Sequence, residues 1–196
     1  MIIIGLTGGI GAGKTTVSKL FALLNIPIYI ADDRAKRILD IDGEVQNKIK
    51  TLFGENSIVN GTVNRKLIAI ESFGHPKILE QLNAIIHPAV STDFEKWKAD
   101  NNSAPYVVKE AAILFESGSH VGCDKIILVS APLETRIDRV MKRDAITKSE
   151  VESRIINQWV EDKKKALSDF IIRNDEENSL ISQVMRIHKK ILDENS

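Results

Sequence analysis

One short segment near the start of the chain combines the residue types that bind phosphate. It runs from Gly8 to Thr15 with the letters GGIGAGKT, which fit the pattern G-x-x-x-x-G-K-S/T. Glycines let backbone N–H groups converge on an anion, and the start of a helix adds partial positive charge. Lys14 is expected to reach the β- and γ-phosphates of a nucleotide, and the Thr15 hydroxyl to bind Mg²⁺. The alternative is a glycine-rich turn without a ligand, but a chance match in this chain is on the order of 1%.

Two consecutive carboxylates, Asp32 and Asp33, directly follow a short apolar run at residues 28–30. Such a run predicts a buried strand, and open α/β sheets bind ligands beyond the carboxyl ends of their strands. Asp32 is therefore predicted to lie beside the phosphates, where it can take the proton of an attacking hydroxyl or hold Mg²⁺ through water. Asp33 is assigned the ordinary role of N-cap for a helix that starts near Arg34.

A third cluster consists of the arginines Arg136, Arg139 and Arg143, which fall on one stripe of a predicted helix. The neighbouring stripe is apolar and consists of Ile137, Val140 and Met141. The helix is expected to dock by its apolar side and to present three guanidiniums, whose planar forks suit phosphoryl oxygens. A solvated helix with surface salt bridges is the alternative interpretation.

The elements that position these residues alternate along the chain. Short apolar runs predict five buried strands, at residues 2–6, 28–30, 107–108, 126–129 and 170–172. Helical patterns lie between them, beginning with residues 15–24, whose apolar positions follow the i, i+3, i+4, i+7 spacing. Thr147 and Glu150 fit a capping box that starts a helix running to about residue 158. The chain is thus predicted to wind a parallel sheet that helices cover on both sides.

The stretch from about residue 35 to 99 differs because it has helical periodicity and little strand signal. It is predicted to form a helical lobe inserted into a core of residues 1–34 and 100–196, all within a single domain. Residues from about 136 to 150 are predicted to form a lid. His87-Pro88 is expected to break the last helix of the lobe, because the residue before a proline is pushed out of the α region.

Composition excludes several classes of protein. The 27 Lys and Arg residues balance 27 Asp and Glu, so bulk charge gives no support for a nucleic-acid partner. No uncharged stretch approaches the roughly 18 residues of a membrane span, and the start of the chain lacks the basic region of a signal peptide. The single cysteine, Cys123, cannot form an intramolecular disulfide. A cytoplasmic protein without nucleic-acid or membrane partners is expected.

Motifs in order along nearly the whole chain resemble the dephospho-coenzyme A kinase family. They are LTGGIGAGKTTV at 6–17, Ala31-Asp32, GTVNR at 61–65, Leu82-Asn83 with His87-Pro88, ILFE at 113–116, Arg139 with Arg143, Gln158, and IRN at 172–174. The resemblance implies a P-loop kinase-like α/β fold with a helical substrate-binding lobe and a lid. It also implies transfer of the ATP γ-phosphate to the ribose 3′-hydroxyl of dephospho-coenzyme A, with Mg²⁺ as cofactor. This reaction is the last step of coenzyme A synthesis.

The resemblance further implies roles for particular residues. The ATP phosphates would be held by Gly11, Ala12, Gly13, Lys14, Thr15 and Thr16. Asp32 would be the general base, acting with Lys14 and with Arg139 of the lid. Arg139 and Arg143 would contact ATP, and Asn174 would lie by the adenine. Dephospho-coenzyme A would be bound by Thr7, Asp32, Arg65 and His87. A monomer or weak homo-oligomer is expected.

Two positions depart from the pattern common in this family. Ile30 stands where an acidic residue is frequent, which leaves Asp32 and Asp33 as the strand-end candidates, and Ala112 stands where a proline is frequent. A nucleotide kinase is the nearer alternative because it shares the loop, the lobe and the lid arginines. A GTPase would need an N-K-x-D motif, which this sequence lacks. A nucleotide-binding scaffold without turnover would leave Asp32 and the arginine stripe without a role.

Overall fold

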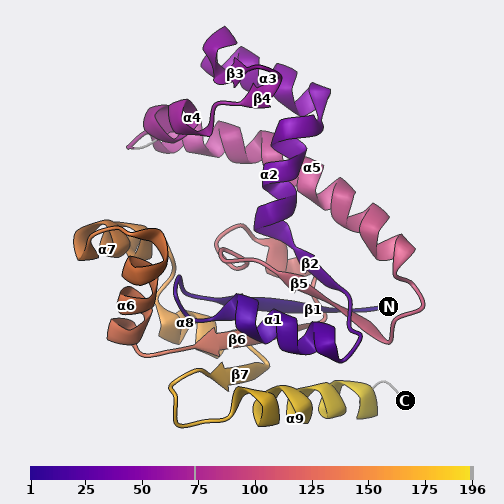
Figure 1. Cartoon of the computed structure of the whole chain (residues 1–196). Coiled ribbons are helices and arrows are strands. Elements are labelled where there is room, and N and C mark those ends of the chain that lie inside the picture. The colour runs from indigo at the N-terminus through magenta and orange to yellow at the C-terminus, as the bar shows by residue number, and fades with distance from the viewer. Residues whose placement is uncertain (73, 195–196) are drawn as a thin grey trace. The chain divides into compact units, whose positions relative to one another are not determined.

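The computed structural model of the protein describes residues 1–72 and 74–194. The chain divides into two compact units (Figure 1). The first consists of Met1–Ile30 with Asn101–Ser196, and the second of Ala31–Asp100. Among residues 1–72 and 74–194, no helix has the length and apolarity needed to cross a bilayer.

The first unit is built on a five-stranded parallel sheet in the order β2-β5-β1-β6-β7. The strands are β1 (Ile2–Gly8), β2 (Ile28–Ile30), β5 (Tyr106–Glu110), β6 (Lys125–Ser130) and β7 (Phe170–Arg173). In the central strand, Ile4 pairs with Val108 of β5, and Leu6 pairs with Ile127 of β6. The five predicted strands are confirmed, and their carboxyl ends open on one edge of the sheet, where such sheets bind ligands.

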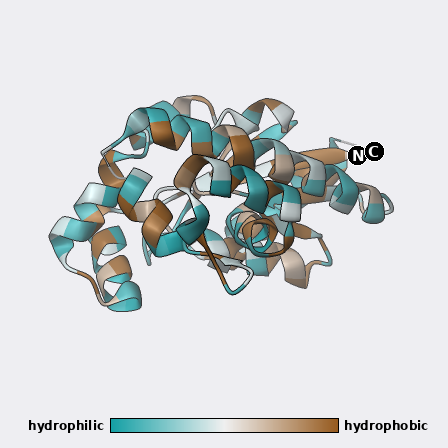
Figure 2. Cartoon of the chain, turned by 90° about the horizontal axis from the view of Figure 1, so that it is seen from above, coloured by the Kyte–Doolittle hydropathy of each residue, from teal (hydrophilic) through white to brown (hydrophobic). Residues whose placement is uncertain are grey.

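Helices cover both faces of this sheet, as the fold class predicts. On one face, α1 (Lys14–Leu23) packs beside α9 (Leu180–Asp193) (Figure 1). Phe21 of α1 and Ile187 of α9 join a buried core with Ile4. The other elements of this unit are η2 (Ser119–Gly122), α6 (Leu133–Asp144), α7 (Lys148–Ile156) and α8 (Glu161–Ala166), the last packed on β6. Figure 2 shows hydrophobic and hydrophilic residues alternating along the helices, as expected for helices with one buried face.

The capping box predicted at the start of α7 is confirmed. The Thr147 side chain accepts a hydrogen bond from the Glu150 N–H, and the Glu150 side chain accepts one from the Thr147 N–H. Two backbone donors at the helix start are thereby satisfied. The helix ends at Ile156, two residues before the predicted end.

The second unit is helical apart from one short hairpin. It contains α2 (Ala31–Ile41), α3 (Gly43–Phe53), η1 (Glu55–Ser57), β3 (Ile58–Val59), β4 (Thr62–Val63), α4 (Arg65–Ser72) and α5 (Pro76–Asp100). Its core draws on every helix of the unit and includes Ile38, Ile49, Ile68 and Leu82. The unit therefore has an apolar centre of its own.

The predicted helix break at His87-Pro88 is wrong, because α5 continues through Pro88. A proline inside a helix removes one hydrogen bond and costs about 3 kcal/mol. Apolar side chains on both sides of it, including Leu82, Ile86 and Val90, pack into the core of the unit. Burying each such side chain contributes roughly 1.5–3 kcal/mol, so the packed face outweighs the local cost.

Candidate active site

The phosphate-binding pattern lies in the loop that joins β1 to α1. Gly11 and Gly13 have φ angles of 78° and 95°, a region that favours glycine. Space requires glycine as well, because a Cβ on Gly11 would lie 2.3 Å from the carbonyl oxygen of Arg136. A Cβ on Gly13 would lie 2.1 Å from the side-chain nitrogen of Asn174. The loop is therefore shaped both by its own backbone and by what packs on it.

This loop leaves several backbone donors for an anion. The N–H groups of Gly11, Gly13 and Thr15 form no hydrogen bond within the part of the chain that the structure describes. The N–H groups of Ala12 and Thr16 are used inside the loop, at 3.0 Å from the carbonyls of Gly9 and Gly13 respectively. Unpaired amides at the start of a ten-residue helix form an anion-binding nest. Ala12 and Thr16, two of the six residues predicted to hold the phosphates, have their amides bonded within the loop here, and their contact with phosphate stays a prediction.

Lys14 adds a full positive charge to this nest. Its ammonium donates a hydrogen bond to the carbonyl oxygen of Gly8 at 3.0 Å, so the side chain folds back over the loop. A lysine in this position can exchange a backbone carbonyl for phosphate oxygens, which are stronger partners for an ammonium group.

Thr15 lies next to a carboxylate that the sequence analysis missed. Its hydroxyl donates to Glu110 Oε1 at 3.5 Å, and Glu110 is only 5% exposed. Glu110 Oε2 is buried and has no hydrogen-bond partner among the residues described. A hydroxyl beside a carboxylate with a spare oxygen suits Mg²⁺, which prefers oxygen ligands. The available signal was that Glu110 is an ionisable residue just past a predicted buried strand, as Asp32 is.

The structure corrects the local setting of Asp32 and Asp33. α2 begins at Ala31, directly after β2, so both carboxylates lie in the first turn of the helix rather than at a strand end. Asp33 is therefore not an N-cap; it pairs with Lys36 at 2.9 Å, three residues further along. Asp32 is exposed. Acidic side chains are favoured in a first helical turn by the helix dipole, which explains why the helix starts earlier than predicted.

The arginine stripe of α6 presents two guanidiniums rather than three. Arg136 is 7% exposed, and its Nε donates to the carbonyl oxygen of Ile10 in the glycine loop at 3.0 Å. Burial lowers the pKa of Arg136, while the charge of Glu161 opposes that shift. Arg136 thus supports the loop from behind, and the expectation that it faces phosphoryl oxygens is wrong.

The other two lid arginines are more accessible. Two nitrogens of Arg139 lie 3.5 Å from the carbonyl oxygen of Asn174, and Glu176 is 3.6 Å away. Arg143 forms a two-pronged pair with Asp144 at 2.7 and 3.0 Å, which raises the pKa of Arg143. Arg139 therefore lies beside Asn174, which contacts the glycine loop, whereas Arg143 is paired within α6.

Asn174 joins the end of β7 to the glycine loop. Its side-chain amide donates to the Ala12 carbonyl at 2.8 Å, and its backbone N–H donates to Ser130 at the same distance. The structure therefore brings the loop, Arg139 and Asn174 together in the first unit. The role of Asn174 beside the adenine stays a prediction.

The predicted substrate contacts are divided between the two units. Thr7 lies on β1, fully buried, and its hydroxyl has no hydrogen-bond partner in residues 1–72 and 74–194. Arg65 opens α4, where it pairs with Asp40 and donates to the Lys36 carbonyl at 3.1 Å. His87 is exposed on α5, and partial burial lowers its pKa. Asp32, Arg65 and His87 thus all belong to the second unit.

Ala112, which stands where the family often has proline, lies in a backbone segment that is held by hydrogen bonds. The Ala112 carbonyl oxygen accepts a hydrogen bond from the Gln158 side chain at 3.3 Å. The preceding Ala111 N–H donates to the Leu6 carbonyl at 3.0 Å, which extends the pairing of β5 with β1. Alanine therefore holds this backbone without the rigidity of a proline.

Comparison with known proteins gives matches over nearly the whole chain. A family model described as Dephospho-CoA kinase matches residues 2–179. A dephospho-CoA kinase of Porphyromonas gingivalis is 39% identical over 188 residues, which cover 95% of this chain and 93% of the relative. A crystal structure from Thermus thermophilus aligns with a TM-score of 0.85 at 33% identity, covering 100% of this chain and 98% of the other.

The fold of a named family member is also shared. A dephospho-CoA kinase from Campylobacter jejuni aligns with a TM-score of 0.72 at 24% identity, covering 99% of this chain and 98% of that one. The matches confirm the predicted fold class, and they confirm the predicted activity, which is ATP-dependent phosphorylation of dephospho-coenzyme A in the last step of coenzyme A synthesis. On this combined basis, the chain belongs to the dephospho-CoA kinase family.

Proposed function

We propose that the glycine loop is the ATP site of this kinase and that particular side chains divide the work of phosphoryl transfer. The observation that carries the proposal is the group of unpaired amides at Gly11, Gly13 and Thr15, at the start of α1 and next to Lys14. These donors would hold the β- and γ-phosphates, with Lys14 neutralising charge between them.

Thr15 and Glu110 would hold Mg²⁺, since the hydroxyl and the buried carboxylate supply adjacent oxygens. When bound, the ion supplies positive charge to the phosphate oxygens. Glu110 in turn orients the Thr15 hydroxyl by accepting its hydrogen bond. Glutamine at position 110 would keep the size of the side chain but lose the negative charge that favours a divalent cation.

Asp32 would accept the proton of the ribose 3′-hydroxyl as that oxygen attacks the γ-phosphorus. The role is supported by the exposure of this carboxylate, which lies two residues after the end of β2. Arg139 would donate its planar fork to the transferred group, where charge spreads over the oxygens in the transition state. Arg143 and the rest of the lid, about residues 136–150, would close over ATP and keep water from the γ-phosphate.

Arg65 and His87 would bind dephospho-coenzyme A, and Thr7 would contribute from β1. Arg65 already pairs with a carboxylate, Asp40, and would exchange it for an anionic group of the substrate. An arginine fork suits such a phosphate group. We further propose that the protein acts in the cytoplasm as a monomer or weak homo-oligomer.

A coupled ADP-release assay tests substrate choice and the role of the lid together. Dephospho-coenzyme A should give turnover, and nucleoside monophosphates should give little; the reverse would favour a nucleotide kinase. Arg139→Ala should lower kcat more than it raises KM, because the fork acts mainly on charge developed in the transition state. Arg139→Lys should restore little, since lysine lacks the fork. A change confined to the KM for dephospho-coenzyme A would make Arg139 a residue of ground-state binding instead.

A further inference from the structure

Both backbone polar groups of Ile10, in the glycine loop, are held by side chains from the start of α6 and from just beyond the end of α7. The Ile10 N–H donates to Gln158 Oε1 at 2.9 Å, and the Ile10 carbonyl accepts from Arg136 Nε at 3.0 Å. Arg136 lies in the first turn of α6, and Gln158 lies two residues beyond the end of α7. The side chain of Ile10 also packs against the apolar cluster of these two helices, formed by Ile137, Val140 and Val151.

Gln158 is itself fixed by the segment that follows β5. Its side-chain amide donates to the Ala112 carbonyl, so one side chain joins two backbones. The next residue, Trp159, donates its N–H to Glu116 Oε1 at 2.8 Å and stacks on Phe115 with 6.0 Å between ring centroids. The same carboxylate forms a buried ion pair with Lys164 at 2.7 Å. Gln158 is therefore held in position by contacts that do not involve the loop.

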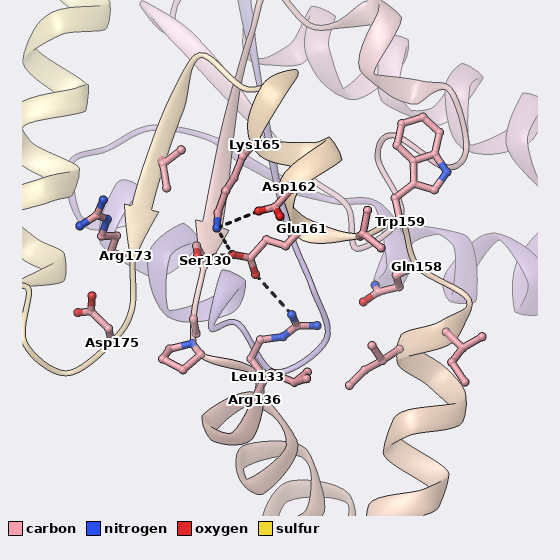
Figure 3. A pocket seen from close by; sticks show the side chains of 16 residues that line it. Ser130, Leu133, Arg136, Gln158, Trp159, Glu161, Asp162, Lys165, Arg173 and Asp175 are labelled. Atoms are coloured by element: carbon pink, nitrogen blue, oxygen red, sulfur yellow. Dashed lines mark hydrogen bonds and ion pairs between the residues drawn. The ribbon is translucent and has the colours of Figure 1, made fainter.

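Arg136, which contacts Ile10 through Nε, also forms an ion pair with Glu161 through another guanidinium nitrogen (Figure 3). Glu161 Oε2 lies 3.5 Å from the Arg136 guanidinium, and Oε1 accepts from Ser130 at 2.6 Å and from Lys165 at 2.9 Å. These residues line a cavity of about 910 Å³. Burial disfavours the charged form of Glu161, but the hydrogen bonds from Ser130 and Lys165 outweigh it, so its pKa is lowered. The carboxylate thus stays charged and keeps the guanidinium turned toward Ile10.

Close packing adds to these hydrogen bonds. A Cβ on Gly9 would lie 2.1 Å from a guanidinium nitrogen of Arg136, and Gly11 approaches the Arg136 backbone as described above. Two of the loop glycines are therefore needed to admit this arginine as well as to admit phosphate. The side chain of Arg136 fits the loop closely along its length.

We propose that Gln158 and Arg136 are positioning residues, which set the glycine loop in its nucleotide-binding form by holding Ile10 from both sides. With the N–H and the carbonyl of Ile10 fixed, rotation of the adjoining peptides is restricted, and the Gly11 and Gly13 amides stay turned toward the anion. This inference rests on the proposed ATP site. It also implies that the segment formed by α6 and α7 is anchored at both ends, so that closure of the proposed lid must come from the residues between Arg136 and Gln158.

The central test replaces Gln158 by methionine, which keeps the length of the side chain and removes both hydrogen bonds. ATP affinity measured by calorimetry with Mg²⁺ should fall about tenfold, the scale of one lost hydrogen bond that leaves a partner unpaired. KM for ATP should rise similarly, while kcat at saturating ATP and the affinity for dephospho-coenzyme A should stay within about twofold. Asn157→Leu is the matched control, because Asn157 is exposed at the C-cap of α7 and its side chain donates to the Ser153 carbonyl, within the same helix.

Two further measurements separate positioning from general damage. Amide hydrogen exchange at Ile10, read by NMR without nucleotide, should accelerate in Gln158→Met and stay unchanged in Asn157→Leu. Arg136→Met removes the hydrogen bond to the Ile10 carbonyl and should weaken ATP binding with the same selectivity. If Gln158→Met does not fold, this variant tests the positioning role in its place. The double variant should lose less ATP affinity than the product of the two single losses, because both act through Ile10.

Different results would indicate that the positioning role is wrong and that the proposed ATP site is wrong. If the unaltered protein does not bind ATP, the proposed ATP site is wrong, whereas Ile10 exchange still reports whether Gln158 holds the loop. A folded Gln158→Met protein that binds ATP within twofold of normal would overturn the positioning role. Equal losses for ATP and dephospho-coenzyme A, with a lowered melting temperature, would overturn it too, since they indicate general destabilisation.

Discussion

The two units hold their functional residues in contrasting ways. In the first unit, the glycine loop is tied to distant parts of the chain, as when Asn174 donates to the Ala12 carbonyl. In the second unit, the predicted site residues are exposed or lie in partly exposed ion pairs, as when Asp33 pairs with Lys36 and Arg65 pairs with Asp40 while Asp32 is exposed. Donors that are fixed in advance lower the cost of binding a charged group. Under the proposed function, the nucleotide site is therefore formed before its ligand binds, whereas the charged residues proposed for the acceptor remain free to exchange partners.

The largest effect is expected from Lys14→Ala, which removes the charge at the centre of the prebuilt end. Turnover should fall by on the order of 10³-fold, the scale of losing a strong electrostatic contact to the transition state. The melting temperature should change by no more than a few degrees, because Lys14 is not part of the core. ADP-release kinetics and a thermal melt check both points, and near-normal turnover would refute the assignment of the loop as the ATP site.

A stability measurement tests the same contrast away from the active site. Lys164 pairs with Glu116 at 2.7 Å with side-chain exposures of 2% and 13%, whereas Lys48 pairs with Glu44 at the same distance but at 55% and 80%. Lys164→Met should cost about 3 kcal/mol of unfolding free energy, because it leaves a buried carboxylate uncompensated. Lys48→Met should cost less than about 0.5 kcal/mol. Urea unfolding of both variants measures these free energies. Equal losses would show that the buried pair contributes no more to stability than the exposed pair.

In the second unit, substitutions of Asp32 and Asp33 should have clearly different effects on kcat. Asp32→Asn should lower kcat about 10²-fold, since asparagine cannot accept the proton, and ATP affinity should persist. Asp33→Asn should leave the rate nearly unchanged, because its partner is the exposed Lys36. The measurement is kcat for each variant beside calorimetric ATP binding. If only Asp33→Asn lost activity, Asp33 rather than Asp32 would be the general base. If both variants stayed active, phosphoryl transfer would depend on Mg²⁺ and substrate positioning without a side-chain base.

The smallest effect concerns the acid end of the pH range. Hydrogen bonds from Arg143, followed by those from Arg154, lower the pKa of Asp144 from 3.8 to about 2. A folded-state pKa below the unfolded value adds stability above pH 3.8, and that stability is lost as pH falls toward 2. Asp144→Asn should therefore be slightly less stable than the unaltered protein at pH 6, and the difference should shrink toward pH 2 and vanish below it. Melting temperatures across this range test it, and a difference that grew on acidification would contradict it.

Much of the first unit could be predicted because its signals are local and strong. Short β-branched runs are typical of buried parallel strands, and the spacing of Gly8, Gly13, Lys14 and Thr15 leaves few alternatives. The capping box at Thr147 is likewise a pattern of four adjacent residues. These features depend on neighbours in sequence, which is why the sequence suffices for them.

The remaining features depended on distant contacts or on balances of energy. Helical periodicity places Arg136 on the same stripe as Arg139, but its contacts with Gly9, Ile10 and Glu161, all distant in sequence, account for its burial. Pro88 carries a local signal to stop a helix, which the packing of α5 overrides. Glu110 gains meaning only once the sheet places the end of β5 beside Thr15. Sequence spacing contains none of these three pieces of information.

The order of strands in the sheet has a consequence for how the protein is made. β1 leaves the ribosome first, yet its partners β5 and β6 begin at Tyr106 and Lys125. At about 5–20 residues per second, the central strand waits on the order of 5–20 s for its neighbours. The contiguous second unit can complete its own contacts in that interval. The glycine loop waits longer still for Asn174, whose side chain donates to the Ala12 carbonyl, so a prematurely released chain would carry the helical unit together with a glycine loop that lacks this contact.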